Sequence, residues 1–152
     1  MTTIRDCIAP DRNPKVPNIK LPKGSIDTHV HIFESQYPLF EGRGYNPPDS
    51  TLDDLKHLHT QLGVSRVVYT QPSPYGVDNS AILKGMKVMN NETPGRARGV
   101  CAIKMDVSDS FLEDLDKQGI KGVRLNMDNI GGMPIGLDEI PTLEARIKDL
   151  GW

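Results

Sequence analysis

The sequence predicts an α/β fold of the (β/α)8 (TIM) barrel type, to which this chain of 152 residues contributes about four βα units, or half a barrel. The first observation is an alternation of β-branched and amphipathic segments in the order β-α-β-α-β-α-β-α, which favours a parallel sheet with right-handed crossovers. The second is an internal echo, because residues 63–71 resemble residues 119–127, about two βα units further along the chain. Such a regular repeat suits a barrel better than a doubly wound sheet with irregular spacing.

Composition and charge exclude several classes of protein. Lysine and arginine number 18 against 20 aspartates and glutamates, so the formal net charge is −2 and no basic nucleic-acid footprint is present. No apolar run approaches the roughly 18 residues that cross a bilayer, and no secretory signal follows Met1. Cys7 and Cys101 alone make no disulfide framework. We therefore expect a cytoplasmic protein that binds neither nucleic acid nor membrane.

Residues 1–24 are predicted to form an extended, proline-rich N-terminal arm. Four prolines fix φ and remove backbone donors there, namely Pro10, Pro14, Pro17 and Pro22. The residues between them show no periodic spacing of apolar side chains. Residues 25–152 are then the N-terminal half of a barrel domain. Because half a barrel leaves open sheet edges and apolar faces, we also expect a tendency to self-associate or to pair with a complementary half.

Four strands are predicted from short runs of β-branched and apolar residues. They cover residues 25–33, 64–70, 97–104 and 120–127, and Trp152 stands where a fifth would begin. In a parallel barrel, the loops that follow the carboxyl ends of the strands build the functional site. Polar side chains at those ends are therefore the first candidates.

The first predicted helix opens at Ser50, whose side chain can cap a backbone N–H, with Asp53 three residues on. It ends at Gly63. Its apolar stripe consists of Leu52, Leu55, Leu58 and Leu62.

The other three predicted helices have similar signals. One begins at residues 78–80, and the next opens with the capping-box pattern 110–113 and ends at Gly119. The last has Pro141 in its first turn, where the missing N–H does no harm, and ends at Gly151.

The strongest chemical signal is the run Asp27-Thr-His29-Val-His31 on the first strand. Side chains alternate along a strand, so Asp27, His29 and His31 are predicted to share the inner face. Two imidazoles about 6.6 Å apart along one strand can converge on one substrate or one metal, and zinc accepts such a pair with ligands from other strands. The alternative is that both are core histidines satisfied by their neighbours.

His57 and His59 differ from that pair. They are two apart on a helix rich in polar residues, so they do not share a face. We interpret both as surface residues.

Polar residues also follow the second and fourth strands. Arg124 and Asn126 are predicted to point inward, where an arginine needs an anion such as a substrate carboxylate; an internal salt bridge to Asp27 or to a neighbouring strand is the alternative. Ser73 lies in the loop 71–79 and could bind a substrate oxygen. No Gly-x-Ser-x-Gly elbow surrounds it, so it is not predicted to be a nucleophile.

These motifs together resemble the amidohydrolase superfamily, and within it the amidohydrolase-related branch that includes 2-pyrone-4,6-dicarboxylate lactonase. The resemblance runs in family order from about residue 24 to residue 152 and covers the N-terminal half of a family member. It is carried by the segments 26–33, 44–49, 71–79, 97–100, 122–126 and 150–152.

The resemblance implies a barrel hydrolase that opens lactones or related C–O bonds of small carboxylic acids. It implies that His29 and His31 contact a metal or the reacting carbonyl. It further implies that Tyr45 and Ser73 contact the substrate and that Arg124 holds its carboxylate.

The resemblance leaves the cofactor open. Many members carry a metal-bridging lysine at the end of the fourth strand, where this chain has Arg124 and Asn126. A two-metal site is therefore not expected, while a single zinc on His29 and His31 and a metal-free reaction both remain open. The general base of the family comes from a later strand, which would lie beyond Trp152.

Two functions follow. The first is a hydrolase of a small anionic lactone or similar ester that uses the His29/His31 pair. The second is a catalytically incomplete half-barrel that acts as a structural or interaction remnant or needs a partner half. A flavodoxin-like binding module is disfavoured because the chain has no phosphate-binding loop.

Overall fold

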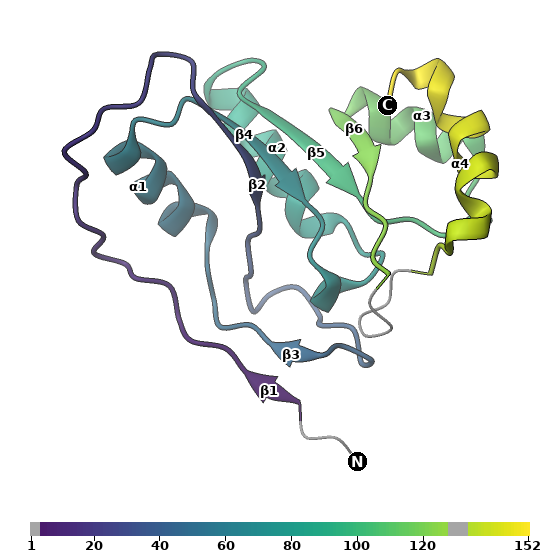
Figure 1. Ribbon diagram of the computed structural model, residues 1–152, viewed down its shortest axis with the longest axis horizontal. Coiled ribbons are helices and arrows are strands. Elements are labelled where there is room, and N and C mark those ends of the chain that lie inside the picture. Colours follow the sequence, from purple (N-terminus) through teal and green to yellow (C-terminus); the bar gives the residue numbers. More distant parts are fainter. Residues whose placement is uncertain (1–3, 128–133) are drawn as a thin grey trace.

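The protein is described by a computed structural model that covers residues 4–127 and 134–152. Four strands, all paired in parallel, form a sheet in the order β2-β4-β5-β6 (Figure 1). The α/β class and the parallel sheet are thus confirmed. The strands are β2 (Ile26–Val30), β4 (Arg66–Thr70), β5 (Ala97–Cys101) and β6 (Ile120–Val123).

Each of these strands lies inside its predicted range but is shorter than predicted. The prediction followed apolar runs, whereas a strand lasts only while a neighbour pairs with it. The residues beyond the paired part leave the sheet at its carboxyl-terminal edge. Arg124 is the first residue after β6, so it lies at this edge.

The helices alternate with the strands as predicted. They are α1 (Leu52–Leu62), α2 (Ser80–Glu92), α3 (Asp109–Lys117) and α4 (Ile140–Ile147). α2 packs on β4 and β5, and α3 packs on β6 (Figure 1). No helix in the described part of the chain is both long and apolar enough to cross a membrane.

The start of α1 corrects the predicted cap by one residue. Thr51 is the N-cap, with its side chain accepting from the N–H of Asp54 and the Asp54 carboxylate accepting from the N–H of Thr51. Ser50 instead exchanges two backbone hydrogen bonds with Phe33, of 2.8 and 2.9 Å. α3 is shifted similarly, because its cap is Ser108 rather than Ser110.

The core joins the sheet to all four helices, and α2 contributes the most residues to it. Tyr69 of β4 is fully buried, and its hydroxyl donates to the sulfur of Met89 on α2 at 3.4 Å. A Cβ on Gly85 would lie 3.1 Å from side-chain atoms of Ile32 and Tyr69, so only glycine lets α2 approach this closely. From Ile4 onward, the first residue of the core cluster is Val30.

The arm forms a small second sheet with the loop that follows β2. β1 (Arg5–Asp6) pairs in parallel with β3 (Tyr45–Asn46), which lies in the loop between β2 and α1 (Figure 1). From Ile8 to Lys23 the arm is mostly exposed and runs around the outside of α1 (Figure 1). At the other end of the chain, the Trp152 indole donates to the carboxylate of Asp116 on α3 at 2.8 Å.

Candidate functional site

The two strand histidines lie side by side at the carboxyl-terminal end of β2. Their ring centroids are 5.0 Å apart and the rings meet edge to face. His29 is exposed and His31 is half-buried, while the intervening Val30 is buried in the core. Alternation along the extended chain produces this arrangement, as the sequence predicts.

His31 is oriented by the end of the neighbouring strand. Its Nδ1 lies 2.8 Å from the carbonyl oxygen of Thr70, and because a carbonyl can only accept, Nδ1 carries the proton. Burial lowers the pKa of His31, and the positive charge of Arg124 lowers it further. A neutral His31 in this tautomer keeps an unprotonated Nε2, which can accept a proton or bind a metal ion.

Arg124 is held by the next carbonyl of the same segment. Its backbone N–H donates to Cys101 at the end of β5 (2.7 Å), and its Nη1 donates to the Gln71 carbonyl (2.7 Å). The alternative of an ion pair with Asp27 is not found among the described residues. Asn126 is half-buried two residues further on.

Tyr45 and Ser73 also come together. Ser73 begins the short 3-10 helix η1 (Ser73–Tyr75) after β4, and its side chain is hydrogen-bonded to the Tyr45 hydroxyl. Burial raises the pKa of Tyr45, while Ser73 and the charge of Arg124 lower it. Four residues predicted from the sequence are therefore neighbours at one edge of the sheet: His31, Tyr45, Ser73 and Arg124.

Asp27 and His59 lie elsewhere than predicted. The pairing of β2 with β4 shifts register between Asp27 and Val30, so the alternation is interrupted. The Asp27 carboxylate reaches His59 on α1, with Oδ2 3.2 Å from Nε2, and His59 is only 1% exposed. Asp27 thus does not share the inner face with the histidine pair. His57 is exposed as predicted, but the surface prediction for His59 is wrong.

A signal for the buried His59 was present in the sequence. Position 59 falls on the same helix face as Leu52, Leu55 and Leu62, because the successive separations are three, four and three residues. Because histidine is polar, His59 was not counted as part of that apolar stripe. Burial lowers the pKa of His59 although Asp27 raises it, so His59 is neutral and donates its Nε2 proton to the carboxylate.

Sequence reasoning missed an aromatic row that continues from the histidines. The ring of Phe33 lies 6.2 Å from that of His31 and 5.7 Å from that of Tyr75, which in turn lies 6.1 Å from Tyr37. The rings of Phe33, Tyr37 and Tyr75 line an open cavity of about 410 Å³ together with Arg43. The cavity therefore extends outward from the site over the loop that carries Tyr45.

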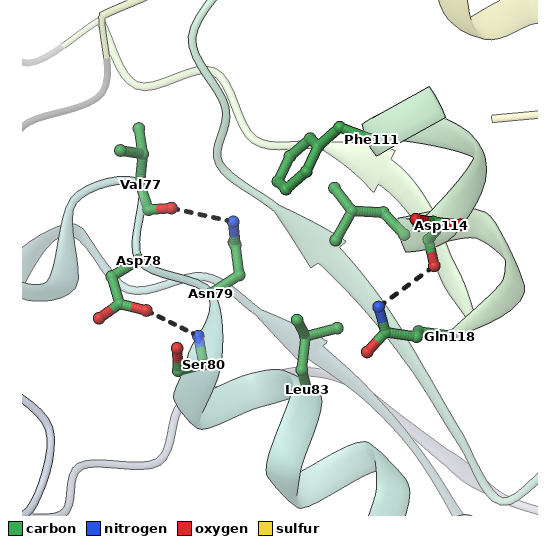
Figure 2. A pocket seen from close by; sticks show the side chains of 9 residues that line it. Val77, Asp78, Asn79, Ser80, Leu83, Phe111, Asp114 and Gln118 are labelled. Carbon is green, nitrogen blue, oxygen red and sulfur yellow. Dashed lines mark hydrogen bonds between the residues drawn. The ribbon is translucent and has the colours of Figure 1, made fainter. Parts of the chain in front are cut away.

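A second cavity of about 400 Å³ lies between α2 and α3 (Figure 2). Its polar groups are satisfied locally: Asn79 Nδ2 donates to the Val77 carbonyl, and the N–H of Ser80 donates to Asp78. Phe111 flanks the opening from α3 (Figure 2). None of the residues predicted to bind or react lines this cavity.

The metal question rests on the two histidines alone. Within residues 4–127 and 134–152, no three or more histidine, cysteine, aspartate or glutamate side chains are grouped so that they could hold a metal ion. Two imidazoles on one face, one with an unprotonated Nε2, fit half of a typical zinc site. Further ligands would have to come from outside these ranges.

Comparisons with known proteins agree with the resemblance. Residues 26–152 match a family described as amidohydrolase. The chain is 35% identical to 2-pyrone-4,6-dicarboxylate hydrolase of Comamonas testosteroni, over 92% of this chain and 45% of that protein. It is 32% identical to 4-sulfomuconolactone hydrolase of Rhizobium radiobacter, over 98% of this chain and 50% of that protein. The chain thus spans about half the length of the curated relatives it matches.

Solved structures give the same result. A protein described as a probable 2-pyrone-4,6-dicarboxylic acid hydrolase of Acinetobacter baumannii, solved with citric acid bound, superposes with a TM-score of 0.73 at 26% identity. That match covers 85% of this chain and 47% of the other. A Pseudomonas putida protein described as a 2-pyrone-4,6-dicarboxylic acid hydrolase superposes with a TM-score of 0.68 at 35% identity, over 87% of this chain and 47% of the other.

Proposed function

The chain belongs to the amidohydrolase family, and from that premise we propose that it is the N-terminal half of a (β/α)8 barrel hydrolase that opens small carboxylate-bearing lactones. Its relatives named for lactone hydrolysis and its relative named D-galactarolactone isomerase all act on lactones, which supports this class of substrate. Four parallel strands in consecutive order are what half of such a barrel requires.

The observation that carries the proposal is the joint anchoring of His31 and Arg124. Consecutive carbonyls at the end of β4, those of Thr70 and Gln71, fix the imidazole and the guanidinium. A reactive nitrogen and a fixed cation are thereby held beside each other at the carboxyl-terminal edge of the sheet. This pairing suits a substrate that has an electrophilic carbonyl close to a carboxylate.

In this proposal Arg124 binds the carboxylate, since only one of its guanidinium nitrogens is used by the Gln71 carbonyl. Tyr45 and Ser73 donate hydrogen bonds to other substrate oxygens, and Asn126 adds a further polar contact. His29 and His31 face the scissile carbonyl and, with the charge held nearby, assist the attack of water. The product is an open-chain acid with one new carboxylate and one new hydroxyl group.

A divalent metal, with zinc as the candidate, would be held by His29 and His31. When bound it would act as a Lewis acid on the carbonyl. A metal-free reaction uses the same two side chains directly on the substrate. Measuring the metal content of the purified protein and the activity after chelation separates the two versions.

The test is hydrolysis of 2-pyrone-4,6-dicarboxylate and 4-sulfomuconolactone by the full-length protein. We expect His29→Ala and His31→Ala each to lower kcat/KM by about 10²–10⁴-fold, because each removes a group that acts on the reacting centre. Arg124→Ala should mainly raise KM for these anionic substrates. His57→Ala, on the exposed face of α1, is the matched control. Unchanged kcat/KM in both strand variants would overturn the proposal.

A second candidate is an interaction role, and one observation favours it. Within the described residues, β2 and β6 form the outer edges of the sheet and each pairs on one side only. A half-barrel with such edges would pair with a complementary half or with a second copy. Light scattering after size-exclusion chromatography tests this. A chain that stays monomeric at every protein concentration measured would contradict the interaction role.

A further inference from the structure

We propose that the N-terminal strand β1 is a positioning element for the substrate site, which it serves by holding Tyr45 against Ser73. The inference rests on the proposed function, because Tyr45 is taken to bind the substrate. It assigns a role to a segment that makes no contribution to the buried core, whose first member is Val30.

The backbone contacts place β1 directly beside the segment that carries Tyr45. Arg5 pairs with Tyr45 and Asp6 pairs with Asn46 in parallel register. The N–H of Cys7 then donates to the carbonyl of Asn46 at 3.0 Å. The strand therefore fixes the backbone on which the Tyr45 side chain is mounted.

Side-chain contacts lock the same register. Asn46 Nδ2 donates to the Asp6 carboxylate at 2.9 Å, and Asn46 Oδ1 accepts from Arg43 Nε at 2.8 Å. The Arg43 Nη1 also donates to the carbonyl of Phe40 at 3.1 Å. Asn46 thus joins the arm on one side to the remainder of the loop on the other.

A second tie lies on the far side of Tyr45. Arg12 Nη2 donates to the carbonyl of Asp49 at 3.0 Å, and Arg12 Nε donates to the carboxylate of Asp54, near the start of α1, at 3.2 Å. The loop segment that contains Tyr45 is therefore held by the arm at two points, one beside the tyrosine and one just before α1.

The consequence concerns affinity rather than chemistry. Tyr45 is hydrogen-bonded to Ser73, which is distant in the sequence, and it feels the charge of Arg124, so its hydroxyl is presented to the site only while the loop keeps this shape. A loop that is already ordered loses less conformational entropy when substrate binds. His29 lies on β2 and His31 directly follows it, so the histidine pair does not depend on the arm.

The experiment removes one backbone donor of the arm. Cys7→Pro deletes the N–H that bonds to Asn46, and Cys7→Ala, which lacks the thiol but retains the N–H, is its reference. Ile8→Pro is the matched control, because Ile8 is 97% exposed and its N–H donates to no acceptor in the described part of the chain. In the full-length protein we expect Cys7→Pro to raise KM for 2-pyrone-4,6-dicarboxylate about tenfold over Cys7→Ala, with kcat changed less than about twofold.

Hydrogen exchange of the peptide that contains residues 43–47 supplies a readout that needs no activity. We expect faster exchange in Cys7→Pro than in Cys7→Ala, at an unchanged melting temperature, because the core is not involved. Equal exchange in the two variants, or faster exchange with an equal KM, would overturn the inference. Failure of the proposed function has a different signature, namely full turnover in His29→Ala and His31→Ala.

Discussion

Two pairs of histidines with the same spacing in the sequence are used in opposite ways. His29 and His31 follow one another on an extended segment, so their rings lie on one side, 5.0 Å apart, at the edge of the sheet. His57 and His59 have the same separation on α1, where it points one outward and buries the other. The spacing of two residues therefore has no meaning until the secondary structure around it is known.

The two pairs also differ in what their nitrogens contact. His31 bonds to a backbone carbonyl through Nδ1, and no hydrogen-bond partner of its Nε2 is found among residues 4–127 and 134–152, which leaves that nitrogen for chemistry. His59 uses its Nε2 on Asp27 and is almost fully buried. The first arrangement suits reactivity, and the second suits stability. Each of the following predictions separates these two roles.

The largest effect is expected for His31→Asn. Asparagine places an N–H close to the position of Nδ1 and can keep the bond to Thr70, but it has no counterpart of Nε2. We expect kcat/KM for lactone hydrolysis to fall by about 10²–10⁴-fold while the urea midpoint hardly moves. A variant with near-normal kcat/KM would show that His31 acts through its structural bond alone.

The next effect is expected for His59→Ala. The substitution opens a cavity behind β2 and takes the imidazole partner from the Asp27 carboxylate, so we expect the free energy of unfolding to fall by about 1–3 kcal/mol. Urea denaturation measures it. His59→Gln can offer an N–H to Asp27 and should recover part of the loss. A loss as small as that of His57→Ala would mean that the buried pair contributes nothing.

These results bear on what the sequence could predict. Alternation and helix stops gave the order of the elements and brought together His29 and His31, because those signals are local. The predicted cap of α1 is wrong by one residue because Ser50 forms a backbone pair with Phe33, which is distant in the sequence. The contacts between the arm and Asn46 could not be predicted either, because a parallel pairing of only two residues leaves no periodic pattern in the sequence.

The Asp27 error has the same origin. Strict alternation put Asp27 on the face of His29, but a shift in register before Val30 turned it toward α1. Such irregularities arise from pairing between strands and cannot be read from one strand alone. The predicted roles of Tyr45, Ser73, Arg124 and Asn126 in substrate binding stay predictions that the proposed assays test.

A smaller effect is expected from pH. Burial lowers the pKa of both His31 and His59 from the ordinary value of 6.5, so the unfolded chain binds more protons than the folded one below that pH. Stability should be full above about pH 6.5 and should fall as the pH drops toward the lowered folded values. Each histidine can contribute a slope of up to about 1.4 kcal/mol per pH unit.

Urea midpoints between pH 5 and 7 measure this slope. Some carboxyls, such as those of Asp54 and Asp116, have a pKa lowered from the ordinary value of 3.8. They therefore contribute little to the change of stability between pH 5 and 7. We expect His59→Gln to show a shallower slope than the parent protein. An identical slope would mean that His59 is protonated in the folded state, in contrast to its burial.

The smallest effect is expected for His57→Ala, and its smallness is informative. His57 is exposed on α1 and alanine has a higher helix propensity, so the free energy of unfolding should change by no more than about 0.5 kcal/mol and could rise slightly. The value of kcat/KM should also stay unchanged. A loss of 1 kcal/mol or more on urea denaturation would mean that the exposed position on α1 has a structural role and that the contrast within the helical pair does not come from burial.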